Sequence, residues 1–402
     1  MKKAIFLLLI LISNLNCLKN HNELKDDRII WESEYSGEKD ALIVDFPLIA
    51  KDKVIISRDD FLSQESALVA FDKKNGKKLW EWQKEYLISA SNARFKHVLR
   101  GFRQYNNVIV GIDSKYMVGI DLETGKTLWE NKFDYQIDER SVLYNEKIYF
   151  MGRNTENNMI NVIAIDPSSG NIENVVDIKS MYSGFTIHNQ GMHIFKNNTN
   201  DICMLLGIYH VKNAFKPNEI KKYNLINYNI TKKEFIFNMS FNHKIGINVF
   251  YIHENIIYAN GYYFSTFDLS TGKLLNQFKE DVMTGFYTSI YDYPYVYLMY
   301  NNLTNKFVKV NMKTGKEIWR ISLDGHQSYM MRKKDNRIFM IARNGKMFIV
   351  DSDSGAIIER VNAPYASKNY KLVFDENFSI DKETGYLYCS DFKHLFCYDF
   401  DR

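Results

Sequence analysis

The chain has 402 residues, of which 46% are hydrophobic, 15% aromatic and 25% charged, which is enough apolar material for a large core and too little charge bias for disorder. The 52 Lys and Arg residues nearly balance the 48 Asp and Glu residues, and no basic block stands out, so nucleic acid is not expected as a partner. The 27 Tyr and 27 Phe residues favour strands over helices.

The first residues have the order of an export signal. Lys2 and Lys3 precede nine apolar residues, 4–12, and a short polar stretch follows. As a helix this run would rise only about 14 Å, roughly half the thickness of the hydrocarbon core of a membrane. We therefore predict a signal peptide at residues 1–16 and an exported mature protein.

A cysteine lies directly after this signal. Cys17 stands where a bacterial lipoprotein signal places its acylated cysteine, and the segment resembles that family of signals, although Leu15 and Asn16 fit its usual pattern loosely. The alternative is an ordinary cleaved signal with an incidental cysteine. We predict acylation of Cys17, which would hold the protein at a membrane through several acyl chains, and a linker at residues 17–27.

One short pattern recurs along the rest of the chain: an alternating strand, an Asp or Asn, a Gly four residues later, and a second strand. The Asp or Asn can hydrogen-bond its own turn, and Gly suits a positive φ angle, so each copy predicts a β-hairpin. In one degenerate copy Lys233 replaces Gly, which predicts a turn that has another geometry or is strained. The copies are Asp72–Gly76, Asp121–Gly125, Asp166–Gly170, Asn229–Lys233, Asp268–Gly272, Asn311–Gly315 and Asp351–Gly355.

Two more strand-like runs precede each hairpin, so each unit has four strands, and successive turns are 39 to 63 residues apart, which brackets the length of a propeller blade. The last unit stops at Arg402 without its fourth strand, whereas residues 28–34 match the fourth strands at 77–83 and 126–132. We therefore predict an all-β fold: a single eight-bladed β-propeller over residues 28–402, made of four-stranded antiparallel sheets. The N-terminal strand completes the last blade, which removes two open sheet edges.

The phrase Asp-x-x-Thr-Gly-Lys-x-x-Trp occurs at residues 121–129 and, with Asn first, at 311–319. It resembles the repeat of the pyrroloquinoline quinone (PQQ)-like propellers, and the resemblance spans nearly all of residues 28–402. In that family the tryptophans dock between neighbouring blades. The resemblance therefore implies a packing role, rather than ligand stacking, for the tryptophans at the repeat position: Trp31, Trp80, Trp129 and Trp319.

This family contains two functional kinds. Its quinoprotein dehydrogenases hold PQQ and a calcium ion in the central channel, often beside a pair of adjacent cysteines. Here no two cysteines are adjacent, and the 386 residues after the signal leave about 48 for each blade, with little for a cofactor cap. An enzyme is therefore disfavoured, and no cofactor or metal is expected. The other kind, exported lipoproteins of outer-membrane β-barrel assembly, is similar to this chain in signal, blade number and length.

Few side chains point to chemistry. Cys389 and Cys397 lie on neighbouring strands of the last unit, where they form either a disulfide or two separate core residues, because a shift of one residue in register turns one of them to the other face. Cys203 is predicted to be a buried thiol. Three histidines of the longest unit lack the spacing of a metal site, and the periodic Asp residues are predicted to form turns, not to act as acids or bases. The histidines are His188, His193 and His210.

Loop lengths predict where a partner binds. The turn between third and fourth strands is short in every unit, whereas longer connections occur at residues 58–66, 84–97, 153–158 and 211–219. In a four-strand meander these longer connections emerge on one face of the ring, which we predict to be the binding surface. The sequence thus predicts a monomeric, non-catalytic scaffold that binds another protein at the periplasmic side of the outer membrane. The alternatives are a PQQ-dependent oxidoreductase and a propeller that binds polysaccharide or an extracellular partner.

Overall fold

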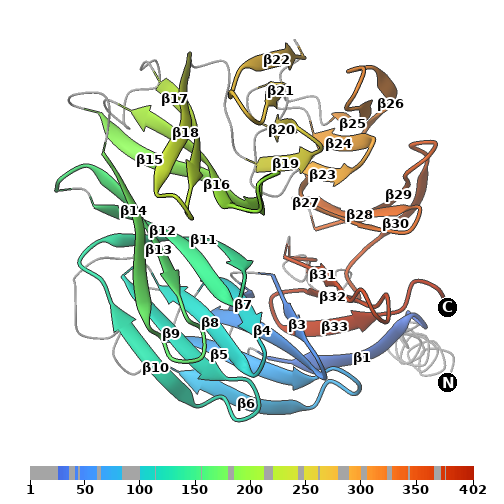
Figure 1. Cartoon of the computed structure of the whole chain (residues 1–402). Coiled ribbons are helices and arrows are strands. Elements are labelled where there is room, and N and C mark those ends of the chain that lie inside the picture. The colour runs from blue at the N-terminus through green and yellow to red at the C-terminus, as the bar shows by residue number, and fades with distance from the viewer. Residues whose placement is uncertain are drawn as a thin grey trace, which may run out of the picture.

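The computed structural model describes residues 26–402 apart from 36–40, 44–45, 61–64, 84–99, 114, 155, 180–184, 212–220, 243–248, 261–262, 279–288, 300–305, 324–327, 343–344, 366–372 and 376. Eight antiparallel sheets surround a common axis, and the regular elements of the described residues are all strands (Figure 1). The predicted eight-bladed propeller is therefore confirmed. The described residues contain no helix that could span a membrane.

Each blade is a meander in which consecutive strands pair, with its first strand nearest the axis (Figure 1). In blade 1 this first strand is divided into β2 and β3, which both pair with β4. The strands of blades 1 to 4 are, in order, β2 (Ala41–Ile43), β3 (Leu48–Ala50), β4 (Lys53–Asp60), β5 (Glu65–Asp72) and β6 (Lys78–Gln83); β7 (Arg100–Tyr105), β8 (Val108–Asp113), β9 (Tyr116–Asp121) and β10 (Thr127–Lys132); β11 (Gln136–Tyr144), β12 (Lys147–Asn154), β13 (Met159–Ile165) and β14 (Ile172–Lys179); and β15 (Thr186–Lys196), β16 (Ile202–Val211), β17 (Lys221–Asn229) and β18 (Glu234–Asn242).

Blades 5 to 8 follow the same plan. Their strands are β19 (Val249–His253), β20 (Ile256–Asn260), β21 (Phe264–Asp268) and β22 (Leu274–Gln277); β23 (Ser289–Asp292), β24 (Tyr295–Met299), β25 (Lys306–Asn311) and β26 (Glu317–Ser322); β27 (Ser328–Lys334), β28 (Arg337–Ala342), β29 (Met347–Asp351) and β30 (Ile357–Val361); and β31 (Ser379–Ile380), β32 (Leu387–Ser390), β33 (His394–Tyr398) and β1 (Ile29–Glu34).

The N-terminal strand closes the ring, as predicted. β1 pairs antiparallel with β33, so that Ile29 lies opposite Tyr398 and Trp31 opposite Cys397. Arg28, just before β1, also contacts the preceding blade, because its guanidinium lies 2.8 Å from both carboxylate oxygens of Glu359 on β30. Residues from the two ends of the chain therefore share one sheet, and β1 supplies the fourth strand of blade 8.

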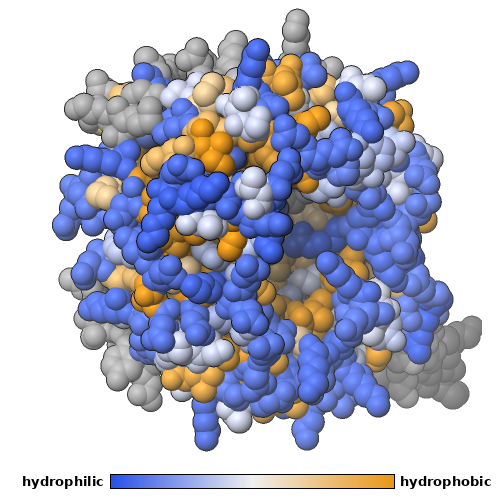
Figure 2. All heavy atoms as spheres, viewed as in Figure 1, coloured by the Kyte–Doolittle hydropathy of each residue, from blue (hydrophilic) through white to orange (hydrophobic). Residues whose placement is uncertain are grey.

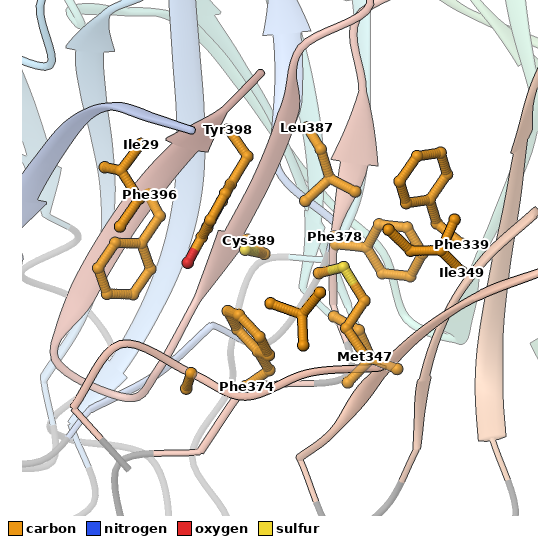
Figure 3. Packing of buried hydrophobic residues seen from close by; sticks show 13 residues of the cluster. Ile29, Phe339, Met347, Ile349, Phe374, Phe378, Leu387, Cys389, Phe396 and Tyr398 are labelled. Carbon is orange, nitrogen blue, oxygen red and sulfur yellow. The ribbon is translucent and has the colours of Figure 1, made fainter. Parts of the chain in front are cut away.

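The core is a series of apolar clusters, each between two neighbouring blades. Figure 3 shows the cluster between blades 7 and 8, where Cys389 lies among aromatic side chains that include Phe374 and Tyr398. Cys397 belongs to the next cluster, between blades 8 and 1. Its partner in the ladder is Tyr388, not Cys389, so the two cysteines point to opposite faces of the sheet. Both thiols are buried and free, and so is Cys203. Of the two alternatives, separate core residues are therefore right, and the expected buried Cys203 is confirmed.

The repeated turns use glycine for its backbone conformation. At Asp121–Gly125 the Asp121 carboxylate accepts the backbone N–H groups of Glu123 and Thr124 at 3.1 and 2.7 Å, and Gly125 has a φ of 69°. Lys233 has a φ of 58°, so the degenerate turn keeps this left-handed conformation and is the strained alternative of the two that were predicted. The sequence prediction missed one further turn of this type, Asp381–Gly385, which joins the first two strands of blade 8.

Candidate functional site

The two ends of the ring differ. We call the end that carries the short turns, such as Asp72–Gly76, the turn face, and the end that carries the second-to-third and interblade connections the loop face. Of the four long connections predicted there, residues 84–97 lie wholly, and 58–66 and 211–219 partly, outside the described residues, whereas 153–158 is described except for residue 155. The view in Figure 2 is largely hydrophilic and has a hollow near its middle.

A cavity of about 330 Å³ opens on the loop face between blades 3 and 4. Its lining comes from the loop-face ends of the first three strands of blade 3 and the first two strands of blade 4. These are the start of β11, the end of β12, the start of β13, the start of β15 and the end of β16. The set is mixed, with two arginines, one carboxylate, two aromatic rings and an apolar part. The lining residues are Gln136, Ile137, Asp138, Arg140, Met151, Gly152, Arg153, Ile160, His188 and Tyr209.

Arg153 is the central cation of this cavity. Its guanidinium lies 2.9 Å from Nδ1 of His188 in blade 4 and donates to Oε1 of Gln136 at 2.9 Å, so it bridges the two blades. A guanidinium can only donate, so Nδ1 of His188 must accept, which leaves the hydrogen of this neutral imidazole on Nε2. Within the described part of the chain, no carboxylate lies within salt-bridge distance of Arg153.

A second arginine is placed by an irregularity in β11. The pairing of β11 with β12 shifts between Ile137 and Ser141, which displaces the residues between them from the regular ladder. Within this bulge the Asp138 carboxylate accepts the backbone N–H of Arg140 and lies 2.9 Å from its Nε. Burial raises the pKa of Tyr209, and the charges of Arg140 and Arg153 oppose this rise.

The wall and floor of the cavity are aromatic and apolar. His188 and Tyr209 are opposite each other in the β15–β16 ladder, and their rings stack at 4.7 Å with an angle of 14° between planes. Met151 and Ile160 form the floor and are 1% exposed, because they belong to the apolar cluster that joins blades 3 and 4. The cavity can therefore take a small group that carries both a negative charge and an apolar part.

The predicted packing tryptophans lie on the turn face, at four other blade interfaces. Each indole Nε1–H donates to a backbone carbonyl in the turn of the next blade, at 2.9 to 3.1 Å. Each ring also covers the glycine of that turn so closely that a Cβ atom there would lie 2.5 to 2.8 Å from the indole. We call this arrangement a tryptophan clasp. The clasps pair Trp31 with Gly76, Trp80 with Gly125, Trp129 with Gly170 and Trp319 with Gly355.

The interface between blades 3 and 4 has no such clasp. Asn174 occupies the repeat position of the tryptophan and donates to Asp177 of its own strand at 3.1 Å, while Lys233 occupies the position of the glycine. A polar link lies on the loop face instead, where the side chain of Asn158 donates to the carbonyl of Phe185 and accepts the N–H of Ile187 at 3.1 Å. The cavity is therefore located at an interface that is fastened differently from its neighbours.

The sequence prediction did not identify this cavity. It placed the binding surface on the loop face and noted the connection at 153–158, but it selected neither Arg153 nor Arg140, because the repeat does not include these positions. His188 was selected only to be judged unfit for a metal, and the structure places it beside Arg153 instead. The other two selected histidines do not line the cavity. Burial lowers the pKa of His193, and it lowers the pKa of His210 to about 4.

The periodic aspartates stay at their turns. In Asp121 a hydrogen bond from the Thr124 side chain holds the pKa of the carboxyl below its usual value, and Ser354 does the same for Asp351. Such carboxylates are ionised turn formers at neutral pH. Among the described residues, no group of three His, Cys, Asp or Glu side chains is placed to hold a metal ion.

The strand topology defines the protein as an eight-bladed β-propeller of four-stranded antiparallel sheets. Within this class, the sequence model of the family described as "Outer membrane protein assembly factor BamB" matches residues 23–205. This match confirms the predicted resemblance to the PQQ-like repeat family. No curated protein matches the chain in sequence.

Solved structures share the fold at low sequence identity. BamB from Moraxella catarrhalis has a TM-score of 0.59 and 13% identity, over 93% of this chain and 98% of that chain. A europium-containing methanol dehydrogenase has a TM-score of 0.59 and 12% identity, over 83% and 80%. The computationally designed Ika8 protein has a TM-score of 0.58 and 13% identity, over 92% and 99%. An assembly factor, an enzyme and a designed protein thus share this architecture, which by itself decides no function.

Proposed function

We propose that this protein is a non-catalytic, exported scaffold that binds another protein through its loop face, in the assembly of outer-membrane β-barrel proteins. The observation that carries the proposal is the asymmetry of the ring. The turn face is made of short, hydrogen-bonded turns, whereas the loop face carries the longer connections and a cavity with two arginines. Recognition is usually carried by variable loops on a rigid scaffold. The match to the BamB family model supports the choice of partner.

The proposal includes a lipid anchor at Cys17 and a periplasmic location at the outer membrane. A cysteine that follows an export signal would keep the ring close to the membrane in which barrels assemble. Cys17→Ser, which removes the acylation site, should abolish the incorporation of labelled palmitate that we expect for the wild-type protein. Labelling of this variant, or absence of labelling in wild type, would contradict the anchor.

The direct test is crosslinking of the tagged full chain in native membranes, followed by purification and mass spectrometry. We expect recovery of barrel-assembly components, and their reproducible absence would contradict the proposed role. The alternative of a PQQ-dependent oxidoreductase is supported by the shared fold of a methanol dehydrogenase. Uptake of PQQ and calcium by the purified protein, together with dye-linked dehydrogenase activity, would favour this enzyme. If external protease digests the protein in intact cells, a propeller with an extracellular partner is favoured instead.

A further inference from the structure

The cavity between blades 3 and 4 suggests which chemistry the loop face recognises. We propose that this cavity binds a carboxylate on a short apolar stem, with Arg153 as its counter-ion, and that the carboxylate is the side chain of an acidic residue in the protein partner. Only this last part, the source of the carboxylate, rests on the proposed function. The site itself is argued from the geometry of the cavity.

The charge of the cavity favours an anion. Arg153 has two neutral acceptors, Nδ1 of His188 and Oε1 of Gln136, which use two of the five N–H donors of its guanidinium. Within the described residues its positive charge has no carboxylate partner. The cavity also contains Arg140 and Asp138, so two arginines and one aspartate leave a formal charge of +1 when His188 is neutral. An anion is therefore the complementary ligand.

The guanidinium of Arg153 is held in one orientation by residues of two blades. His188 comes from blade 4 and Gln136 from blade 3, and together they fix the plane of the guanidinium before any ligand arrives. A planar guanidinium held in one orientation presents parallel N–H groups to a carboxylate, which can accept two of them. Little side-chain entropy would then be lost on binding, which favours the complex.

The apolar lining of the cavity favours a carboxylate with a stem over an inorganic anion. The cavity floor consists of Met151 and Ile160, each 1% exposed, and the stacked rings of His188 and Tyr209 form one wall. A methylene stem would cover these apolar groups, whereas a hydrated phosphate would not. The volume of about 330 Å³ is at the small end of ligand sites, which suits one side chain rather than a large cofactor.

The test titrates the purified full-length mature protein with four probes and follows binding by NMR. The probes are glutamate with both its amino and carboxyl ends capped, the equally capped glutamine, benzoate and inorganic phosphate. Capped glutamate should bind saturably, with a Kd on the order of 1 mM for so small a ligand. Capped glutamine should bind at least tenfold more weakly. Absence of saturable binding by any carboxylate, or phosphate binding as tight as that of capped glutamate, would overturn the site.

Two variants connect the binding to Arg153. Arg153→Met should weaken capped glutamate at least tenfold, and so should Gln136→Glu, which places an internal carboxylate beside the guanidinium with almost no change of shape. Arg320→Met is the matched control, because Arg320 is an exposed arginine on β26, far from the cavity along the ring, and should leave binding unchanged. Unchanged binding in both cavity variants would overturn the assignment.

Benzoate identifies the source of the carboxylate. If benzoate binds at least tenfold more tightly than capped glutamate, the site stands but its ligand is a free organic acid. This result would overturn the assignment of the carboxylate to a side chain of the protein partner. The two proposals fail differently. Barrel-assembly components recovered equally by wild type and Arg153→Met, together with no carboxylate binding, would remove the site and keep the proposed function. Carboxylate binding without any recovered assembly component would keep the site and remove the proposed function.

Discussion

The interface between blades 8 and 1 and the interface between blades 3 and 4 are built from the same repeat but fastened in different ways. At the first, Trp31 covers Gly76 and donates to the carbonyl of Lys73 at 2.9 Å. At the second, the corresponding residues are Asn174 and Lys233, the polar link moves to the loop face, and a cavity opens there.

This difference explains why the tryptophan position and the glycine position of the repeat change together. In a clasped turn a Cβ atom would collide with the indole, so only glycine fits, and it also supplies the positive φ. Once the tryptophan is absent, the turn can hold a side chain, and the only remaining penalty is the left-handed backbone of Lys233. Blades 3 and 4 are then joined by their apolar cluster, by Asn158 and by the contact of Arg153 with His188. At this interface the turn face has no clasp, and the cavity opens at the loop-face end.

The largest predicted effect removes a clasp. Trp31→Ala should lower the free energy of unfolding by about 3–5 kcal/mol, because Trp31 is 6% exposed and packs in the cluster that joins the last blade to the first. Asn174→Ala, at the same repeat position, should change it by less than about 0.5 kcal/mol. Chemical denaturation of both variants measures the contrast, and equal effects would show that the clasp is not what fastens the ring.

A pH effect should come from blade 4. Burial lowers the pKa of His210 to about 4, below its unfolded value of 6.5, so the unfolded chain binds the extra proton between these two pH values. Stability should therefore be unaffected above pH 6.5 and should fall as the pH drops toward 4, by about 2–3 kcal/mol from this residue. Denaturation at pH 7 and pH 4.5 should show a smaller difference for His210→Gln. If His210→Gln loses as much stability as wild type between pH 7 and pH 4.5, other groups cause the loss.

A smaller effect tests why clasped turns need glycine. Gly125→Ala should lower the free energy of unfolding by about 2 kcal/mol, because the new Cβ meets Trp80 at 2.7 Å and φ is 69°. In a Trp80→Ala background the same change should be less harmful by at least about 1 kcal/mol, since only the backbone penalty remains. A double-mutant cycle measures this coupling, and strictly additive effects would contradict steric exclusion by the indole.

The smallest effect has the opposite sign. Lys233→Gly should raise the free energy of unfolding by about 0.5–1 kcal/mol, because glycine adopts the φ of 58° without the strain of a side chain. Lys232→Gly, one residue earlier in the same turn, is the matched control and should not stabilise, since no positive φ occurs there. A destabilised Lys233→Gly protein would indicate that the Lys233 side chain has a role of its own.

The fold was predictable because its information is periodic. The turn residues, the strand alternation and the match of residues 28–34 to the fourth strands together determined eight blades and the closure. Each of these signals is local, and it recurs in several units of the chain. A single non-repeated detail was harder: the register of the last hairpin decides whether Cys389 and Cys397 meet, and spacing alone left this open by one residue.

The cavity could not be predicted in the same way. Arg153, His188 and Gln136 come from three strands of two blades and lie outside the repeat pattern, so only the packing of blades 3 and 4 brings them together. One signal was present in the sequence. The unit between Gly170 and Lys233 is the longest, and it combines a polar residue at the tryptophan position, Asn174, with a turn that lacks glycine. A repeat unit that departs from its consensus at both partner positions marks an interface worth inspecting.

The most direct test of the account compares the two faces of the ring in living cells. A photo-crosslinking amino acid is placed at Asn157, an exposed residue of the loop beside the cavity, and separately at Lys74, an exposed residue of the turn face. We expect a crosslinked adduct with a barrel-assembly protein from Asn157, which Arg153→Met reduces at least tenfold, and no adduct from Lys74. An adduct from Lys74 alone, or equal adducts from both positions, would contradict it.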